Sequence, residues 1–268
     1  MKYVVHENAA DGLILNHAKY TGLKKDAMAI HTHNDYELLY ILSGDVSHVI
    51  ENRKYKLKKD DLVIIKPNMY HFVQVDSSKD YERYNILFNP KLLGINNIEL
   101  LPEGIEIINC KHRPLITELF KKTDYYSGVL KGEELKDMAS MIIKELKYNL
   151  SLADIGEDPT LWENIHPLIS KAINEINNNL FTIASIEEIA LKLGVSESYL
   201  YRIFKKELKT TPLKYLTEKR LLIAQNQILC GKKPTEVYSE CGFLDYTSFY
   251  RGYLKLFGYS PSKEGKKK

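Results

Sequence analysis

The strongest constraint on the fold of this 268-residue chain is an internal repeat in its last third. When the sequence is displaced by 49 residues, a segment that begins at Ser196 matches one that begins at Asp245. Both segments carry apolar residues at helical spacing with polar residues between them. The repeated polar residues are two N-cap candidates and two Tyr-Arg pairs: Ser196 and Asp245, Tyr201-Arg202 and Tyr250-Arg251. Such self-similarity indicates one helical unit that is used twice.

The residues before each repeat complete a helix-turn-helix pattern. In the first unit, Ala190 is small where two helices must cross closely, and Gly194 can adopt a positive φ that ends the first helix. Ser196 can then accept a hydrogen bond from a backbone N–H group of the next helix. Helical periodicity predicts helices over residues 165–177, 186–193, 196–208, 212–229, 234–241 and 245–256.

Charge is distributed unevenly along the chain. The whole sequence has a net charge of +3, from 38 Lys and Arg against 35 Asp and Glu. Residues 165–268 hold 17 basic and 10 acidic side chains, a net charge of +7, so the rest of the chain is at −4. A basic segment is the electrostatic footprint of a protein that binds a polyanion.

Ser185–Pro261 resembles the DNA-binding domain of AraC/XylS-type transcriptional regulators. The motifs that carry the resemblance are Gly194–Lys206, Tyr215-Leu216, Arg220-Leu221 with Ala224, Cys241–Tyr246, Phe249–Arg251 and Phe257–Pro261. The resemblance implies a fold of seven helices in which two recognition helices enter successive major grooves on one face of the DNA. It also implies that outward side chains of these helices contact DNA, namely Ser198, Tyr201, Arg202, Lys205, Tyr246, Thr247, Tyr250 and Arg251.

The sequence departs from this family pattern at several positions. The departures are Lys209 for a helix-ending glycine, Tyr238 for a small alanine, Gly252 inside the second recognition helix, Leu254 for a basic residue and Glu264-Gly265 for a Tyr-Arg pair. A glycine inside a helix costs about 1 kcal/mol relative to alanine. Because most departures fall in the second unit, we expect that unit to be looser and Arg251 to contribute less to DNA binding than Arg202.

A different periodicity occupies residues 28–90, where apolar and aromatic residues alternate with polar ones over short stretches. The expected strands cover residues 36–42, 46–50, 55–57, 62–65, 71–75 and 83–88, with turns between them. Short strands at this spacing favour a sandwich or a barrel. From about residue 112 the spacing becomes helical again.

Histidines mark the first of these strands. The run from His31 through His33 to Glu37, followed by Gly44, matches the first cupin motif, and Asp61–Pro67 with His71 resembles the second. The resemblance implies a cupin-like barrel in which such residues converge on one metal ion. Imidazole and carboxylate ligands suit Mn, Fe, Ni or Zn.

Two interpretations of the barrel remain open at this stage. Cupin-type sensor domains of this regulator class often keep the motif without a metal, and here the second motif lacks its usual glycine and places His71 one residue early. We therefore expect His31, His33, Glu37 and His71 to cluster inside the barrel, with His71 displaced from ideal metal coordination. We expect no cofactor, and a pocket for a small effector such as a sugar or a related metabolite. The pocket candidates are His31, His33, Glu37, Tyr40, His48 and His71, with Tyr36 and Tyr70 as further wall residues. In the alternative, His31, His33, Glu37 and His71 bind a metal, in an enzyme or a metal sensor fused to a DNA-binding domain.

An apolar stripe precedes the basic segment. Leu135, Met138, Ile142 and Leu146 recur at helical spacing, which fits either core packing against the barrel or a dimer interface. We expect a homodimer. The expected domains are a cupin-like barrel at 1–110, a helical dimerisation element at 111–150, a linker at 151–163 and the DNA-binding domain at 164–268.

The fold class expected is therefore α+β multidomain: a cupin-like β-barrel with a helical extension, then an all-α domain with two helix-turn-helix units. Three widely spaced cysteines, a polar N-terminus and the lack of an apolar run of about 20 residues favour a cytoplasmic protein without a membrane partner. No nucleophile or phosphate-binding motif is found, so we expect no enzymatic activity. The sequence predicts a sequence-specific DNA-binding transcription regulator that responds to a small molecule, with RNA polymerase as a further partner.

Overall fold

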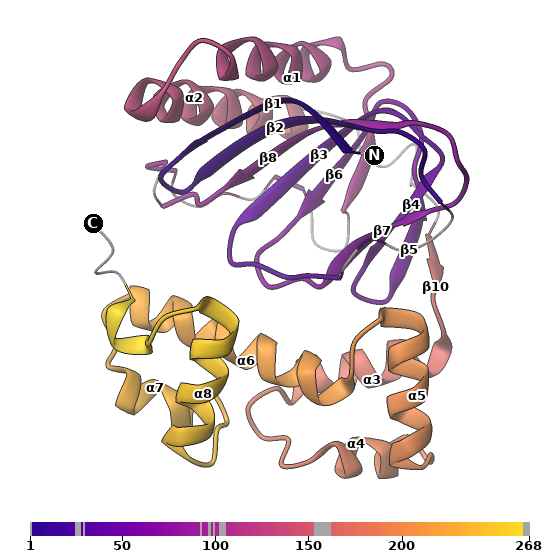
Figure 1. Ribbon diagram of the computed structural model, residues 1–268, viewed down its shortest axis with the longest axis vertical. Helices are drawn as coiled ribbons and strands as arrows, with labels where there is room; N and C mark the ends of the chain where they lie inside the picture. Colours follow the sequence, from indigo (N-terminus) through magenta and orange to yellow (C-terminus); the bar gives the residue numbers. More distant parts are fainter. Residues whose placement is uncertain are drawn as a thin grey trace. The chain divides into compact units, whose positions relative to one another are not determined.

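The computed structural model describes residues 2–24, 28, 30–91, 93–95, 98, 100–101, 106–152 and 162–264 (Figure 1). The chain divides into two compact units, Met1–Glu163 and Asn164–Lys268. The predicted linker at residues 151–163 lies mostly outside the described residues.

Two sheets form the N-terminal unit. Its strands are β1 (Lys2–Ala10), β2 (Leu13–Tyr20), β3 (Tyr36–Ser43), β4 (Val46–Ile50), β5 (Arg53–Lys56), β6 (Asp61–Ile65), β7 (His71–Val75), β8 (Tyr81–Phe88), β9 (Ile107–Asn109) and β10 (Trp162–Asn164). An antiparallel six-stranded sheet has the order β1-β2-β8-β3-β6-β9, and a four-stranded sheet has the order β10-β5-β4-β7. The hairpin β1-β2 and the short strand β9 were not predicted from the sequence.

Two helices, α1 (Pro114–Ser127) and α2 (Gly132–Ser151), cover the outer face of the six-stranded sheet (Figure 1). The stripe of Leu135, Met138, Ile142 and Leu146 is buried in the core between these helices and the sheet. Of the two interpretations of this stripe, core packing is therefore the correct one, because these side chains are not available to a second copy of the chain.

Strand alternation separates two layers of side chains. On β3, Leu38 and Tyr40 face the helices, whereas Leu39 and Ile41 belong to the second core, between the two sheets. Tyr40 was expected to line the effector pocket, and that expectation is wrong: its ring stacks on Phe120 at 4.9 Å between ring centroids, on the outer side of the sheet. The other wall candidate on this strand, Tyr36, also packs on this outer layer.

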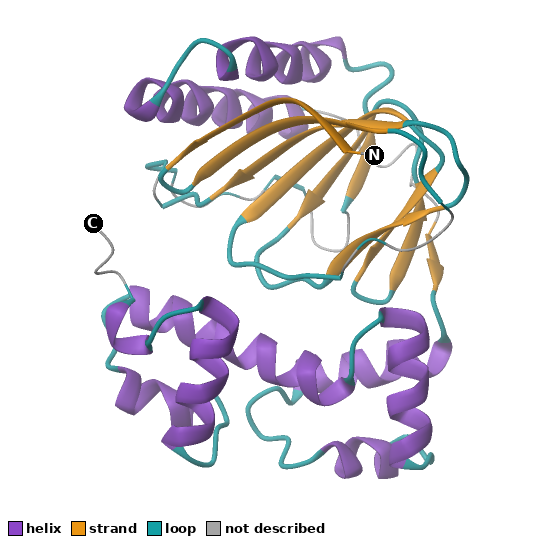
Figure 2. Cartoon of the chain, viewed as in Figure 1, coloured by secondary structure: helices purple, strands orange, loops and turns teal. Residues whose placement is uncertain are grey.

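The C-terminal unit is helical (Figure 2). Its described residues form α3 (Pro167–Asn178), α4 (Ile186–Lys192), α5 (Glu197–Leu208), α6 (Pro212–Leu229), α7 (Pro234–Glu240), α8 (Tyr246–Phe257) and the short 3₁₀ helix η1 (Pro261–Lys263). These seven helices agree with the number implied by the family resemblance. Each predicted helix is present with its ends within two residues of the expected positions.

Candidate DNA-binding surface and effector cavity

The two recognition helices, α5 and α8, start with the predicted caps. The side chain of Ser196 accepts a hydrogen bond from the backbone N–H of Tyr199 at 3.3 Å. Asp245 accepts one from the backbone N–H of Ser248 at 2.8 Å. Because each cap satisfies a helix-terminal donor, both helices begin at equivalent positions of the repeat.

The polar face of each recognition helix is accessible, as its periodicity requires. Inward residues such as Leu200 and Phe249 are fully buried. Of the eight predicted DNA-contact residues, six are exposed, namely Ser198, Arg202, Lys205, Thr247, Tyr250 and Arg251. Tyr201 and Tyr246 are half-buried, and the ring of Tyr246 packs 5.7 Å from that of Phe249. The structure thus gathers the predicted residues on the two helices but assigns Tyr246 partly to the core.

Several departures from the family pattern have a structural explanation. Lys209 adopts a left-handed conformation with φ of 56° at the end of α5, the conformation that Gly258 adopts at the end of α8 with φ of 77°. A Cβ atom on Gly252 would lie 3.2 Å from Cδ1 of Leu221, so this glycine lets α8 approach α6 closely. The ring of Tyr238 packs edge-on against Tyr246 at 5.6 Å.

Glu264, another departure, ties the end of the chain to the second unit. Its carboxylate accepts hydrogen bonds from the hydroxyls of Tyr253 and Tyr259 and from the side-chain amide of Gln225. Together with the close approach at Gly252, these contacts contradict the expectation of a looser second unit.

Arg220 on α6 joins the two helix-turn-helix units. Its guanidinium is buried and donates to the backbone carbonyls of Leu180 at 2.7 Å, Ile183 at 2.7 Å and Gly242 at 2.9 Å. The first two carbonyls precede α4, and the third lies in the turn before α8. The sequence placed Arg220 on one side of α6 but did not show this role, which needs three carbonyls from distant segments.

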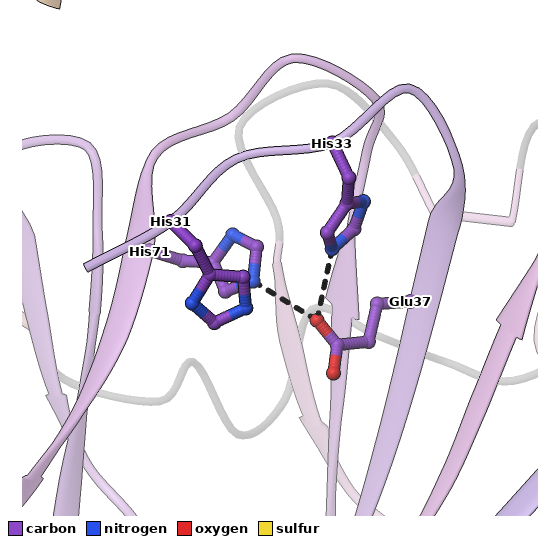
Figure 3. Close-up of side chains that lie close together, drawn as sticks. All are labelled: His31, His33, Glu37 and His71. Atoms are coloured by element: carbon purple, nitrogen blue, oxygen red, sulfur yellow. Dashed lines mark hydrogen bonds and ion pairs between the residues drawn. The ribbon is translucent and has the colours of Figure 1, made fainter. Parts of the chain in front are cut away.

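In the N-terminal unit, four side chains of the cupin motifs converge (Figure 3). Nε2 of His33 lies 3.2 Å and Nε2 of His71 lies 2.9 Å from the same carboxylate oxygen of Glu37. A backbone bridge to His71 holds His31 alongside, with 4.2 Å between the two ring centroids. The expected clustering of His31, His33, Glu37 and His71 inside the barrel is therefore confirmed, and β7 carries His71 into the cluster despite the shorter motif. Its expected displacement from ideal metal coordination stays a prediction.

The hydrogen bonds around this cluster fix the state of each group. Nδ1 of His33 donates to the carbonyl of Asp35, and Nδ1 of His71 donates to that of Met69, both at 2.9 Å. A carbonyl only accepts, so Nδ1 of each ring carries a hydrogen, and Nε2 donates to the carboxylate of Glu37 only in the imidazolium form, which carries a hydrogen on both nitrogens. Burial alone would raise the pKa of Glu37, but the contacts with His33 and His71 hold it well below its usual value. Glu37 is thus a carboxylate.

A cavity of about 280 Å³ opens beside this cluster. Its polar lining includes the predicted residues His31, His33, Glu37, His48 and His71. It also includes Arg83 and Asn85 on β8, which the sequence analysis missed. The available signal was their spacing with Leu87. Arg83, Asn85 and Leu87 are each two residues apart, and residues two apart on a strand lie on the same face of the sheet.

Two family models match the chain. Residues 18–158 match the AraC-like ligand binding domain, and residues 189–267 match a helix-turn-helix domain. A sensor domain followed by paired recognition helices defines a ligand-responsive transcription regulator, and the chain belongs to the AraC family of these regulators.

The chain is also similar to individual proteins. The chain is 24% identical over 250 residues to the HTH-type transcriptional activator RhaR of Salmonella dublin, covering 89% of this chain and 87% of the relative. It is 24% identical over 241 residues to the HTH-type transcriptional regulator YdiP of Escherichia coli K12, covering 87% and 79%. The structure of apo ToxT from Vibrio cholerae aligns with 96% of this chain and 97% of its own, at 16% identity and a TM-score of 0.38. Among the described residues, no helix is both long and apolar enough to cross a membrane.

Proposed function

We propose that this regulator binds double-stranded DNA through the outward faces of α5 and α8, in response to a small molecule held in the N-terminal cavity. The observation that carries the proposal is the repeat itself: two capped helices present equivalent Tyr-Arg pairs from a segment with a net charge of +7. Arginine side chains pair with guanine edges and with phosphates in major grooves. On this proposal the protein works in the cytoplasm, where its operator lies, and has no enzymatic activity.

A gel-shift titration of the full chain against genomic fragments from beside its own gene tests DNA binding. We expect a complex whose affinity falls steeply with salt, because phosphate neutralisation releases counterions. The fragment 164–268 should bind the same site. The double variant Arg202→Ala with Arg251→Ala should lose this binding, whereas Lys171→Ala, an exposed cation on α3, should retain it. Binding by residues 1–150 alone would contradict the assignment.

We also propose a homodimer, formed through the solvent side of α2. Met141, Tyr148 and Leu152 follow one another at helical spacing and are 64%, 68% and 86% exposed. Exposed apolar residues on one helical face are typical of an interface. Glutamate at Met141 and Tyr148 should give a folded monomer in sedimentation analysis, and an unchanged dimer would place the interface elsewhere. The relative RhaR is named as an activator, which supports a contact between this chain and RNA polymerase at promoters.

A second candidate function, metal sensing, is favoured by the histidine cluster. Ligand atoms of His31, His33, Glu37 and His71 lie within 4.8 Å of one another. Ligands about 2.0–2.2 Å from one ion lie about 3 Å apart, close to the His–Glu distances seen here. The Nδ1 atoms of His33 and His71 donate to backbone carbonyls, as in metal-ligating histidines, so the neutral rings would offer their Nε2 lone pairs to an ion. These residues fit Mn, Fe, Ni or Zn, and the ion would supply a Lewis-acidic contact for the effector.

Elemental analysis separates the two candidates. The metal-free proposal expects no ion that survives dialysis. One equivalent of Mn, Fe, Ni or Zn that is retained by the wild type and lost in His33→Ala would establish the metal site. Lys121→Met, a surface change on α1, serves as the matched control.

A further inference from the structure

The effector cavity contains a buried cation that no carboxylate of the described residues pairs with. Arg83 projects from β8 into the cavity, where its guanidinium carbon lies 5.9 Å from the ring centroid of Tyr20 and near the hydroxyl of Tyr81, while its Nε and Nη1 atoms are buried with no hydrogen-bond partner in the described part of the chain. A guanidinium remains charged in proteins. Burying such donors without partners costs free energy, so we expect a bound ligand to supply the missing acceptors.

The neighbouring carboxylate does not complete it. Oε1 of Glu37 accepts a hydrogen bond from Asn85 at 2.8 Å, and Oε2 faces the two histidines. In the strand register, Glu37 lies opposite Leu87, whereas Arg83 lies opposite Ile41. Four residues along β3 therefore separate the two positions, about 13 Å of strand. Glu37 has its own donors, and no carboxylate of the described residues pairs with Arg83.

The opposite wall offers a second unsatisfied polar group. His48 on β4 is 1% exposed, and neither of its ring nitrogens has a hydrogen-bond partner among the described residues. A neutral imidazole ring offers one donor and one acceptor, and both nitrogens of His48 are available to a hydroxyl group of a ligand.

The remaining lining limits the charge and size of the occupant. Arg83 is the single Lys or Arg side chain among the described lining residues. Of the two lining carboxylates, Glu37 faces the histidines and Glu7 accepts a hydrogen bond from Asn16 at 2.8 Å, so a ligand with one negative charge would match the guanidinium. A planar guanidinium fits a carboxylate through two parallel hydrogen bonds. Apolar residues, namely Ile14, Leu39, Val73 and Leu87, line the same cavity of about 280 Å³, a volume that suits a small organic molecule.

We propose that the effector is a small organic acid whose carboxylate pairs with Arg83 and whose hydroxyl group binds His48. This inference rests on the proposed function, because it takes the cavity to be the effector site, and it specifies the chemical class of the effector. A neutral sugar would leave the guanidinium of Arg83 without a counter-charge, whereas a hydroxy acid or sugar acid supplies both required groups.

Thermal unfolding of the full chain tests this with matched probe pairs. The pairs are acetate with acetamide, lactate with lactamide, and D-galacturonate with D-galactose, at equal ionic strength. At least one acid should raise the Tm by about 2–4 °C at millimolar concentrations, while its neutral partner should not. Equal shifts within every pair, or no shift with any acid, would overturn the proposal.

Variants locate the effect at Arg83. In Arg83→Met the acid-dependent shift should vanish, and the Tm without ligand should rise, because an unpaired buried charge has been removed. Lys121→Met, which removes an exposed cation from the same unit, should keep the wild-type response. A fall in Tm or a failure to fold in Arg83→Met would make Arg83 a structural residue and overturn the proposal.

Gel shifts under the same conditions separate this inference from the proposed function. If acids bind through Arg83 but leave DNA affinity unchanged, the chemical class stands and effector control of DNA binding fails. If DNA affinity responds to D-galactose and not to any acid, the regulator stands and the inference about Arg83 fails.

Discussion

In the first helix-turn-helix unit the side chains buried under the recognition helix are mostly aliphatic, as at Leu200, Ile203 and Leu208, whereas the second unit is packed with aromatic rings. The second set comprises Phe249 and Tyr253 with Tyr238, Phe243, Tyr246, Phe257 and Tyr259 around them. Yet in both units a side chain caps the start of the recognition helix, and a residue in the left-handed conformation ends it. The comparison teaches that caps and turns determine the backbone conformation of a helix-turn-helix unit, whereas either aliphatic or aromatic side chains can pack its core.

The largest effect should come from Arg220, the residue that both units share. Arg220→Met removes three donors and leaves buried carbonyls of Leu180, Ile183 and Gly242 unpaired, so we expect a loss of about 3–5 kcal/mol in the free energy of unfolding. Urea denaturation of the fragment 164–268 measures it. Lys219→Met, which removes one bond to Asn177, is the matched control and should cost much less. Equal losses at both positions would mean that the carbonyl contacts add little.

The next comparison concerns DNA contact. The sequence predicted a smaller role for Arg251, on the basis of a looser second unit that the structure does not support. Since both side chains are exposed at equivalent positions, Arg202→Ala and Arg251→Ala should each cost about 1–3 kcal/mol in binding free energy. Titration of each variant against the same operator decides this. A tenfold smaller effect of Arg251→Ala on Kd would restore the original ranking.

The left-handed residues that end the two recognition helices can be substituted in opposite directions. Lys209 pays a steric penalty at φ of 56° that glycine avoids, so Lys209→Gly should stabilise the C-terminal unit by up to about 1 kcal/mol. Gly258→Ala should destabilise it by a similar amount, because φ there is 77°. The two changes in unfolding free energy should have opposite signs. Destabilisation by Lys209→Gly would show that the lysine side chain makes a compensating contact.

The smallest effect is expected at Gly252. Alanine improves helix propensity by about 1 kcal/mol, but its Cβ atom would press on Leu221 at 3.2 Å. The two contributions oppose each other, so the free energy of unfolding should change by less than about 0.5 kcal/mol. Pairing Gly252→Ala with Leu221→Val relieves the contact, and the double variant should then be more stable than Leu221→Val alone. If adding the alanine gives no gain, close approach is not the reason for the glycine.

The sequence predicted the C-terminal unit well because its signals are local: caps, turn glycines and apolar spacing all lie within a few residues of one another. The barrel was harder to predict. In β2, the outer residues Leu13 and Leu15 alternate with Ile14 and Asn16, which line the cavity, so the apolar alternation typical of a strand is broken.

The same polar interior hid part of the candidate site. Arg83 and Asn85 belong to no sequence motif. Their roles depend on which hydrogen-bond partners they have or lack inside the cavity, and that cavity forms only when the two sheets are assembled. By contrast, His31, His33 and Glu37 were predicted because a family motif contains them. His71 was also predicted in the cluster, but motif spacing does not show how far β7 brings its first residue inward, so its exact position could not be predicted.

The clamp at Arg220 has a consequence for the operator. By joining the segment before α4 to the turn before α8, it sets the separation of the two recognition helices within the protein. Successive major grooves on one face of straight B-form DNA repeat about every 34 Å, and any mismatch with the spacing set by the protein must be absorbed by the double helix. Bending a site of 20–30 base pairs costs about 1–6 kcal/mol and depends on the stiffness of each step. We therefore expect the base pairs between the two contacted segments of the operator to influence affinity even where no side chain contacts them, because flexible TA and CA steps bend more easily.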